Sequence, residues 1–284
     1  MEGNECYKFS TISNYFMRTG AKPLGIAVEV GVNVGEVTRL IRETFPTARI
    51  HGFEAVTEYY ERARTAFKGK RGIKLYNKAV TSQHLFLDDL GERPRPEPAE
   101  LRVLKGMPAA GPGWAGGATV LPADHPLVTG PHPLTGFELV DQPVRPITLD
   151  EVVATVLKTE SARRIELLKL DCETCEHSTL GCAAPETLKC FQFIVGEYHG
   201  IERFYNVMER KLFQTHKVNL IGDSSLGCFF AERLEGTSDG ILRYDKDGML
   251  QPRPWLTKEP IDWHLFNEEF VQPQDRASHA LPTA

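Results

Sequence analysis

The most constraining feature of the sequence is an alternation of short apolar runs with amphipathic helical patterns. Residues 25–31 (GIAVEVG) form an apolar run that ends in glycine, and residues 35–43 follow with helical spacing of their apolar positions. Two more apolar runs, 48–54 and 72–76, flank a second helical pattern at 57–67. Strands that alternate with helices in this way predict parallel βαβ units and an α/β fold.

The same alternation resumes in the second half of the chain. Thr148 and Glu151 form a capping box, in which each side chain can bind the other residue's free amide, so a helix is predicted to begin there. The elements expected after it are strands at 165–171 and 191–197, helices at 175–182 and 201–212, and a closing antiparallel strand pair at 217–221 and 226–231 at one sheet edge.

The regular pattern is interrupted by a segment rich in proline and glycine. Of the 19 prolines in the chain, 11 lie between Pro94 and Pro146, so residues 91–146 are predicted to form an irregular insertion. The predicted organisation is therefore an N-terminal helical segment at 1–24, a main domain at 25–231 that carries the insertion, and a loosely structured C-terminal extension at 232–284.

Charge and composition narrow the classes of partner. The chain of 284 residues has a net charge of -5 and no dominant basic block, which argues against nucleic acid and favours a small molecule. We find neither an apolar stretch long enough for a membrane helix nor a signal-peptide pattern, so no membrane association and a cytoplasmic location are expected. Four of the six cysteines lie between Cys172 and Cys190, and all are expected to be reduced.

The ends of the first two predicted strands carry residues suited to a nucleoside. The turn Glu29-x-Gly31-x-Asn33-x-Gly35 lets backbone approach a ligand closely, but it lacks the G-x-G-x-x-G spacing of a dinucleotide clamp. Glu54 ends the second strand, where an acid can accept hydrogen bonds from both ribose hydroxyls. Because an acid-rich turn suits a sulfonium cation, the combination indicates S-adenosylmethionine.

A set of short segments, in this order and approximate spacing, resembles the FkbM family of methyltransferases. The segments are Val28 to Gly35, Phe53-Glu54, Asn77 to Val80, Gly116 to Thr119, Ile147 to Asp150, Leu168 to Glu176, Gly181 and Glu197 to His199. The resemblance implies a class I methyltransferase fold, which is Rossmann-like, with a seven-stranded, mostly parallel sheet, an antiparallel edge strand and helices on both faces. It also implies methylation of an oxygen by S-adenosylmethionine, commonly on a hydroxyl of a sugar or natural product.

The sequence departs from that family at several positions. Glu29 stands where aspartate is usual, Val32 where a small residue is usual, and Thr174 where glycine is typical. Cys172 and Cys175 fall on positions that the family fills with small or apolar residues, so we expect neither zinc nor redox chemistry from this C-x-x-C pair.

Methyl transfer to oxygen needs a group that removes the hydroxyl proton. The candidates are Asp171, Glu197 and His199, of which His199 has the most suitable intrinsic pKa. The same three residues could instead hold a divalent metal ion, which is not favoured, and His199 could simply pack near the helix that follows it. Lys169 and Glu173 could join Asp171 in a catalytic cluster or in a purely structural ion network.

The remaining site residues follow from their positions. Asn77 and Ala79, after the third strand, are expected near the adenine, in addition to the cofactor residues Glu29, Gly31, Asn33, Gly35 and Glu54. Trp114 could be a lid residue over the acceptor or could plug the sheet edge, and Glu176 is a second candidate for substrate contact.

The function predicted from the sequence is an S-adenosylmethionine-dependent O-methyltransferase that acts on a hydroxyl of a small natural product or sugar-containing acceptor. Two alternatives remain: an NAD(P)-dependent oxidoreductase, and a methyltransferase fold that has lost turnover and serves as a binding module. The C-terminal extension, through Trp255 and Trp263, could pin itself to the body or form a homo-oligomer.

Overall fold

A computed structural model of the chain describes residues 9–20, 24–81, 85–88, 91–94, 101–106, 118–122, 137–140, 142, 144–172, 175–222 and 226–234, with only the backbone between 85 and 140. These residues all belong to the first of two units into which the chain divides, Met1–Leu250 and Gln251–Ala284. Among the described helices, we find none that combines the length and the apolar character needed to cross a membrane.

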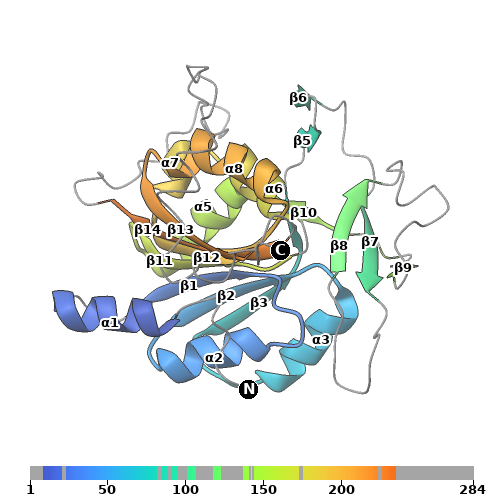
Figure 1. Ribbon diagram of the computed structural model, residues 1–284. Helices are drawn as coiled ribbons and strands as arrows, with labels where there is room; N and C mark the ends of the chain where they lie inside the picture. Colours follow the sequence, from blue (N-terminus) through green and yellow to red (C-terminus); the bar gives the residue numbers. More distant parts are fainter. Residues whose placement is uncertain are drawn as a thin grey trace, which may run out of the picture. The chain divides into compact units, whose positions relative to one another are not determined.

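A seven-stranded sheet forms the centre of the described fold, in the order β13-β14-β12-β11-β1-β2-β3 (Figure 1). All neighbours from β12 to β3 are parallel, whereas β14 runs antiparallel to both β12 and β13. The reversed strand β14 is therefore inserted between β12 and the edge strand β13. The strands are β1 (Ile26–Val30), β2 (Arg49–Glu54), β3 (Ile73–Asn77), β11 (Ile165–Leu170), β12 (Phe191–His199), β13 (His216–Gly222) and β14 (Leu226–Arg233). This arrangement confirms the predicted class I methyltransferase fold.

Helices cover both faces of the sheet (Figure 1). One face carries α1 (Phe9–Thr19), α2 (Glu36–Thr44) and α3 (Thr57–Ala66), and the other carries α5 (Leu149–Glu160), α6 (Cys175–Cys182), α7 (Pro185–Leu188) and α8 (Ile201–Val207). Phe9, Ile12 and Phe16 of α1 pack with Ala27 of β1 and Phe193 of β12 in one buried cluster. The N-terminal helix thus belongs to the core of the main domain, because its apolar stripe covers the sheet.

The helix predicted at Thr148 forms as the capping box requires. The Thr148 hydroxyl accepts from the Glu151 amide, and the Glu151 carboxylate accepts from the Thr148 amide. The helix predicted over 201–212 is present in two parts, because α8 continues into a π-helical turn at Met208–Leu212.

The segment predicted to be irregular contains short strands. An antiparallel hairpin pairs β5 (Leu85–Asp88) with β6 (Gly91–Pro94), and a three-stranded sheet joins β7 (Leu101–Gly106) to β8 (Ala118–Pro122) and β9 (Phe137–Val140). A second unpredicted pair links β4 (Ala79–Val80) with β10 (Pro146–Ile147). Proline and glycine mark turns between short strands as well as irregular chain, so composition alone misjudged this segment.

Candidate active site

The sheet register gathers the predicted site residues at one edge. Val30 of β1 is paired with Phe53 of β2 and Leu170 of β11, and Leu170 is paired in turn with Gly196 of β12. The residues that follow these four positions are Gly31, Glu54, Asp171 and Glu197. Since parallel strands end together, the structure brings the predicted cofactor residues and the predicted catalytic residues to the same carboxyl edge.

The turn after β1 needs its two glycines for different steric reasons. Gly31, Asn33 and Gly35 all have positive φ, at 78°, 52° and 93°. A Cβ on Gly31 would lie 1.7 Å from the carbonyl oxygen of Asp171, and one on Gly35 would lie 2.4 Å from the ring of Phe67. The turn therefore packs backbone directly against the end of β11, which only glycine permits at position 31.

Glu54 ties this turn to the end of β2. Its Oε2 accepts from the backbone amide of Asn33 at 2.7 Å, and its Oε1 accepts from the amide of Val56 at 2.8 Å. Burial raises the pKa of Glu54 to about 7, against the lowering effect of those two amide hydrogen bonds. Because each carboxylate oxygen can accept more than one hydrogen bond, both oxygens of the buried Glu54 carboxylate have accepting capacity beyond these two amides.

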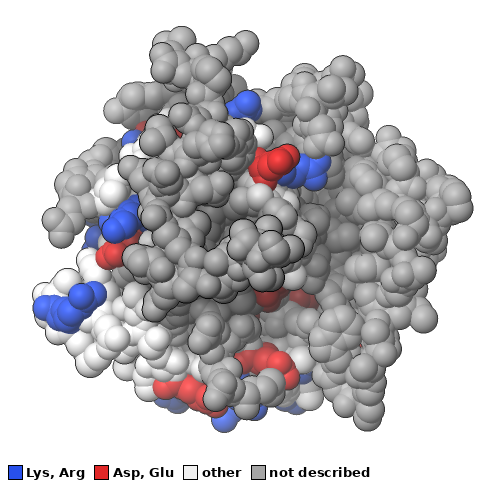
Figure 2. All heavy atoms as spheres, viewed as in Figure 1, with Lys and Arg blue, Asp and Glu red and all other residues white. Residues whose placement is uncertain are grey.

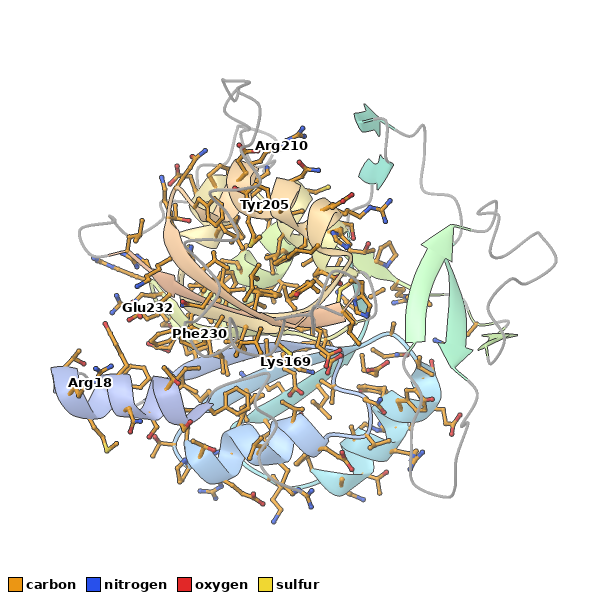
Figure 3. The ribbon with its side chains drawn as sticks, viewed as in Figure 1. Arg18, Lys169, Tyr205, Arg210, Phe230 and Glu232 are labelled. Atoms are coloured by element: carbon orange, nitrogen blue, oxygen red, sulfur yellow. A yellow bond between two sulfur atoms is a disulfide. The ribbon has the colours of Figure 1, made fainter. Side chains whose placement is uncertain are left out.

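Lys169 lies inside the fold and links both sides of the turn (Figure 3). Its Nζ donates to the carbonyl oxygen of Gly31 at 2.8 Å and lies 3.4 Å from Asp171 Oδ2 and 3.6 Å from Glu29 Oε1. Glu29 is fully buried, accepts from the Thr38 hydroxyl at 2.5 Å, and has a raised pKa because of its burial. The lysine and Glu29 thus lie beneath the turn, where they can fix its position.

Asn77 and Ala79 flank the site on the side of β3. The Asn77 side-chain amide donates to the carbonyl oxygens of Glu54 and Ala55, and so holds the loop after β2. Ala79 is buried in the short strand β4. Asn77 is the last residue of β3 and Ala79 follows two residues later, and the contact of both with adenine stays a prediction.

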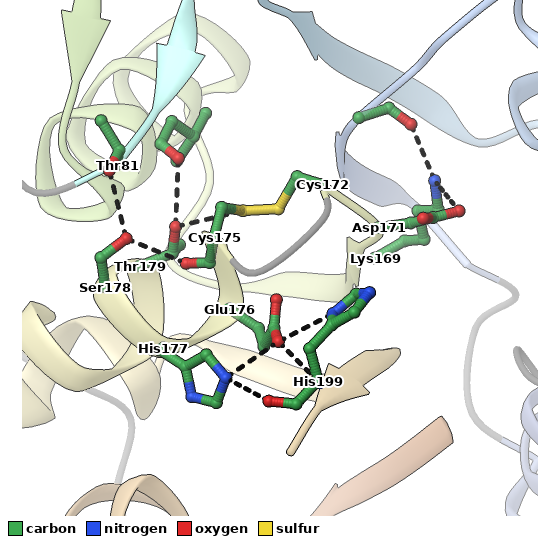
Figure 4. The surroundings of a disulfide bond; sticks show 12 residues. Thr81, Lys169, Asp171, Cys172, Cys175, Glu176, His177, Ser178, Thr179 and His199 are labelled. Atoms are coloured by element: carbon green, nitrogen blue, oxygen red, sulfur yellow. Dashed lines mark hydrogen bonds and ion pairs between the residues drawn. A yellow bond between two sulfur atoms is a disulfide. The ribbon is translucent and has the colours of Figure 1, made fainter. Parts of the chain in front are cut away.

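His199 is held by two residues of α6 (Figure 4). Oε1 of Glu176 accepts from the His199 amide at 2.9 Å and lies 3.0 Å from His199 Nδ1. The neighbouring His177 places its Nε2 2.7 Å from the carbonyl oxygen of His199 and 3.2 Å from Glu176 Oε1. Because a carbonyl oxygen can only accept, His177 Nε2 carries a hydrogen. Burial lowers the pKa of His177, which favours its neutral form.

This arrangement sets the proton positions on His199. Glu176 is almost completely buried, whereas 21% of the His199 side chain is exposed to solvent. A carboxylate opposite Nδ1 favours the tautomer with hydrogen on Nδ1, which leaves the lone pair on Nε2. The structure places Glu176 as the partner of the predicted base, and its contact with a substrate stays a prediction.

Cys172 and Cys175 are joined as a disulfide, which contradicts the expectation that all thiols are reduced. Their Cα atoms lie 5.4 Å apart, a separation that a disulfide spans. Cys182 and Cys190 take no part in a disulfide. The sequence signal for this bond is the C-x-x-C spacing, from which we expect no redox chemistry. Glu173 and Thr174, between the paired cysteines, and Trp114, in the insertion, lie outside the described residues.

Two other expectations concern metal and surface charge. Within the part of the chain that the structure describes, no three His, Cys, Asp or Glu side chains gather as a metal site, and this includes Asp171, Glu197 and His199. In the described part of the face shown in Figure 2, acidic and basic side chains are interspersed.

Glu197, the remaining predicted catalytic residue, lies in β12 and is paired in register with Cys228 of β14.

Sequence reasoning missed two side chains of the site. Thr38, which binds Glu29, lies on α2, and helical spacing alone does not show that this position faces β1. His177, which binds the backbone of His199, follows Glu176 directly and could have been noticed as a second histidine beside the acidic series.

The sheet order, the glycine turn and the acid at the end of β2 define a class I methyltransferase fold. Residues 29–219 match the model of the methyltransferase FkbM domain, so the chain belongs to this family. The family resemblance predicted from the sequence is therefore confirmed, and the protein is a methyltransferase by family. No curated protein is similar enough to this chain to be matched.

Several solved structures are similar to this chain at low sequence identity. The METTL16 methyltransferase domain is 8% identical with a TM-score of 0.44, covering 80% of this chain and 66% of that one. An rRNA methylase from Streptococcus thermophilus is 8% identical with a TM-score of 0.40, covering 79% and 95%. WbdD is 11% identical with a TM-score of 0.40, covering 92% and 45%. These similarities are too weak to suggest a substrate.

Proposed function

We propose that this protein is an S-adenosylmethionine-dependent O-methyltransferase that acts on a hydroxyl of a small natural product or sugar-containing molecule. The observation that carries the proposal is the junction of the glycine turn with Glu54 at the carboxyl ends of β1 and β2. There, Gly31 lets the turn pack against the Asp171 carbonyl, and Glu54 holds the turn through the Asn33 amide and offers its buried carboxylate to ribose hydroxyls. The family membership supports the same conclusion.

The charged side chains at the carboxyl edge of the sheet suit a cationic ligand. Glu29, Glu54 and Asp171 contribute three acidic groups around one buried cation, Lys169. Burial raises the pKa of both Glu29 and Glu54, so a positive ligand charge nearby would favour their ionised forms. S-adenosylmethionine supplies an electrophilic methyl group on a positively charged sulfur, which fits this excess of acids.

Oxygen as the acceptor atom fits the residues at the end of β12. An alcohol must lose its proton as its oxygen attacks, and a histidine backed by a carboxylate is a suitable base. In the proposed mechanism, Nε2 of His199 takes the hydroxyl proton while Glu176 holds Nδ1–H and stabilises the imidazolium. Asp171 and Glu197, at the same edge, remain candidates to orient the acceptor hydroxyl.

Methyl transfer to a panel of acceptors tests this proposal. Radiolabelled methyl groups from S-adenosylmethionine should appear on hydroxyl-bearing sugars or natural products, and mass spectrometry should place the label on oxygen. Primary amines of matched size serve as the contrast. Transfer to amines alone would overturn the choice of oxygen, and hydride exchange with NADH in place of methyl transfer would favour the oxidoreductase alternative.

A further inference from the structure

The Cys172–Cys175 disulfide joins the two halves of the candidate site. Cys172 follows Asp171, whose carboxylate pairs with Lys169 and whose backbone packs against Gly31. Cys175 precedes Glu176, which holds His199. The bond therefore connects the residue after Asp171, which packs against the proposed cofactor turn, with the residue before Glu176, which orients the proposed base (Figure 4).

The contacts of α6 show which part of this helix depends on the bond. Ser178 and Thr179 anchor the helix through the Thr81 hydroxyl and the Val80 carbonyl, at 3.1 Å each. Cys175 and Glu176 occupy the first turn, where the disulfide attaches the helix start to the end of β11. Besides this covalent link, the first turn is held by the Ser178 hydroxyl, which donates to the Cys175 carbonyl at 3.1 Å, and by the Thr179 hydroxyl, which donates to Cys175 Sγ at 3.6 Å.

The position of the bond also allows chemistry with small thiols. Both cysteines are only partly buried, in contrast to the almost fully buried Glu176 beside them. Cys175 is the first residue of α6, and the amide groups at a helix N-terminus stabilise a thiolate, which favours reduction. A reducible disulfide thus lies within one residue of a group that positions the base.

We propose that Cys172 and Cys175 form a reversible thiol–disulfide site whose redox state sets the position of Glu176 and, through it, His199. Reduction by two molecules of a low-molecular-weight thiol such as glutathione breaks the S–S bond. Cys172 and Cys175 each gain one hydrogen, and the two thiol molecules leave joined as their own disulfide. The oxidised form holds His199 in place, and the reduced form releases it. The consequence for methyl transfer rests on the proposed function, whereas the structural coupling does not.

Hydrogen exchange at the His199 amide provides a direct readout, because Glu176 Oε1 accepts this hydrogen. The full-length protein is equilibrated in oxidised or reduced glutathione, and thiol alkylation with mass spectrometry counts the free thiols. We expect Cys172 and Cys175 to change together and reversibly, and the His199 amide to exchange at least tenfold faster in the reduced protein. Cysteines that stay reduced in oxidised glutathione, or equal His199 exchange in both states, would overturn the proposal.

Matched variants separate the redox effect from general destabilisation. Cys172→Ser/Cys175→Ser should show fast His199 exchange in both buffers, whereas Cys182→Ser should respond as the wild type does. Glu176→Ala should exchange fast in both buffers while its disulfide still forms and opens. A redox response of His199 that persists in Glu176→Ala would contradict the proposed route. Titration of the same samples with S-adenosylhomocysteine reports separately on the methyltransferase function.

Discussion

The backbone amide of Asn33 donates to Oε2 of Glu54 across 2.7 Å, which ties the turn after β1 to the end of β2. Asn33 reaches this position through a positive φ of 52°, so the turn is shaped to meet the carboxylate. Any ligand that binds Glu54 therefore meets the turn as well.

The first prediction concerns the pH dependence of ligand affinity. Burial raises the pKa of Glu54 to about 7, and ribose hydroxyls bind the ionised form. Affinity for S-adenosylhomocysteine should therefore rise with pH, by about tenfold between pH 6 and pH 8. Calorimetric titration across this range checks it. Glu54→Gln should bind more weakly and lose this pH dependence; a wild-type affinity that is flat in pH would contradict the role of Glu54.

Glu54 should also affect the free energy of unfolding, and its stabilising contribution should fall as the pH rises. Because the pKa of Glu54 is raised by folding from 4.5, the folded protein holds more protons between pH 4.5 and 7. Its contribution is fully present below pH 4.5 and is lost as the pH rises through about 7. Denaturant unfolding of wild type and Glu54→Gln should show a difference in slope over this window. Parallel pH profiles for the two proteins would rule out the raised pKa.

Glycine should be required at position 31 for two reasons: the positive φ of the backbone and the close contact with the Asp171 carbonyl. Gly31 and Gly69 have φ of 78° and 77°, but a Cβ on Gly69 meets nothing within 4 Å. Gly69→Ala should cost about 1–2 kcal/mol of unfolding free energy for the left-handed backbone alone. Gly31→Ala should cost about 1–3 kcal/mol more, because its methyl group overlaps the Asp171 carbonyl. Equal losses in urea unfolding would contradict the close packing.

Lys169 should be far more important for stability than an exposed lysine. Lys169→Met would leave Glu29 and Asp171 without their shared cation, at a cost of about 3–5 kcal/mol in the free energy of unfolding. The control is Lys74→Met, whose lysine is half exposed beside Glu160 and should cost about 0–1 kcal/mol. Thermal and urea unfolding of both variants provide the comparison, and similar losses would mean that the buried cation has no special role.

The tautomer of His199 gives a further test. Nitrogen NMR of the neutral imidazoles should find hydrogen on Nδ1 of His199, since Glu176 Oε1 lies 3.0 Å away. Glu176→Ala should move this hydrogen toward Nε2. His216 is an internal control, because its Nε2 faces the carbonyl oxygen of Phe191 and should be unaffected. A wild-type His199 with hydrogen on Nε2 would argue against the proposed base.

Much of the fold could be predicted because local pattern and tertiary structure agree. The capping box at Thr148 and Glu151 and the apolar run at Ile165–Leu170 specify their elements through short-range chemistry. The gathering of Gly31, Glu54, Asp171 and Glu197 at one edge followed from the topology of parallel strands. The Glu176–His199 contact could not be predicted, because it depends on how α6 packs against β12.

The cysteines show a different limit of sequence reasoning. Cys172 and Cys175 were discounted because a C-x-x-C pair alone is weak evidence and because cysteine is common in protein cores. Whether such a pair can bond depends on the distance between its two Cα atoms, which sequence spacing does not specify. The short strands of the insertion escaped prediction for a related reason, since their pairing is set by partners distant in sequence.

The most direct measurement is calorimetric titration of the folded protein with S-adenosylhomocysteine at pH 8, with NADH as the control ligand and Glu54→Ala as the control variant. We predict micromolar binding of S-adenosylhomocysteine, no comparable binding of NADH, and at least a tenfold loss of affinity in Glu54→Ala, because hydrogen bonds to a charged group contribute about 1.5–3 kcal/mol. Absence of S-adenosylhomocysteine binding by the folded protein, or tighter binding of NADH, would contradict the proposed cofactor site.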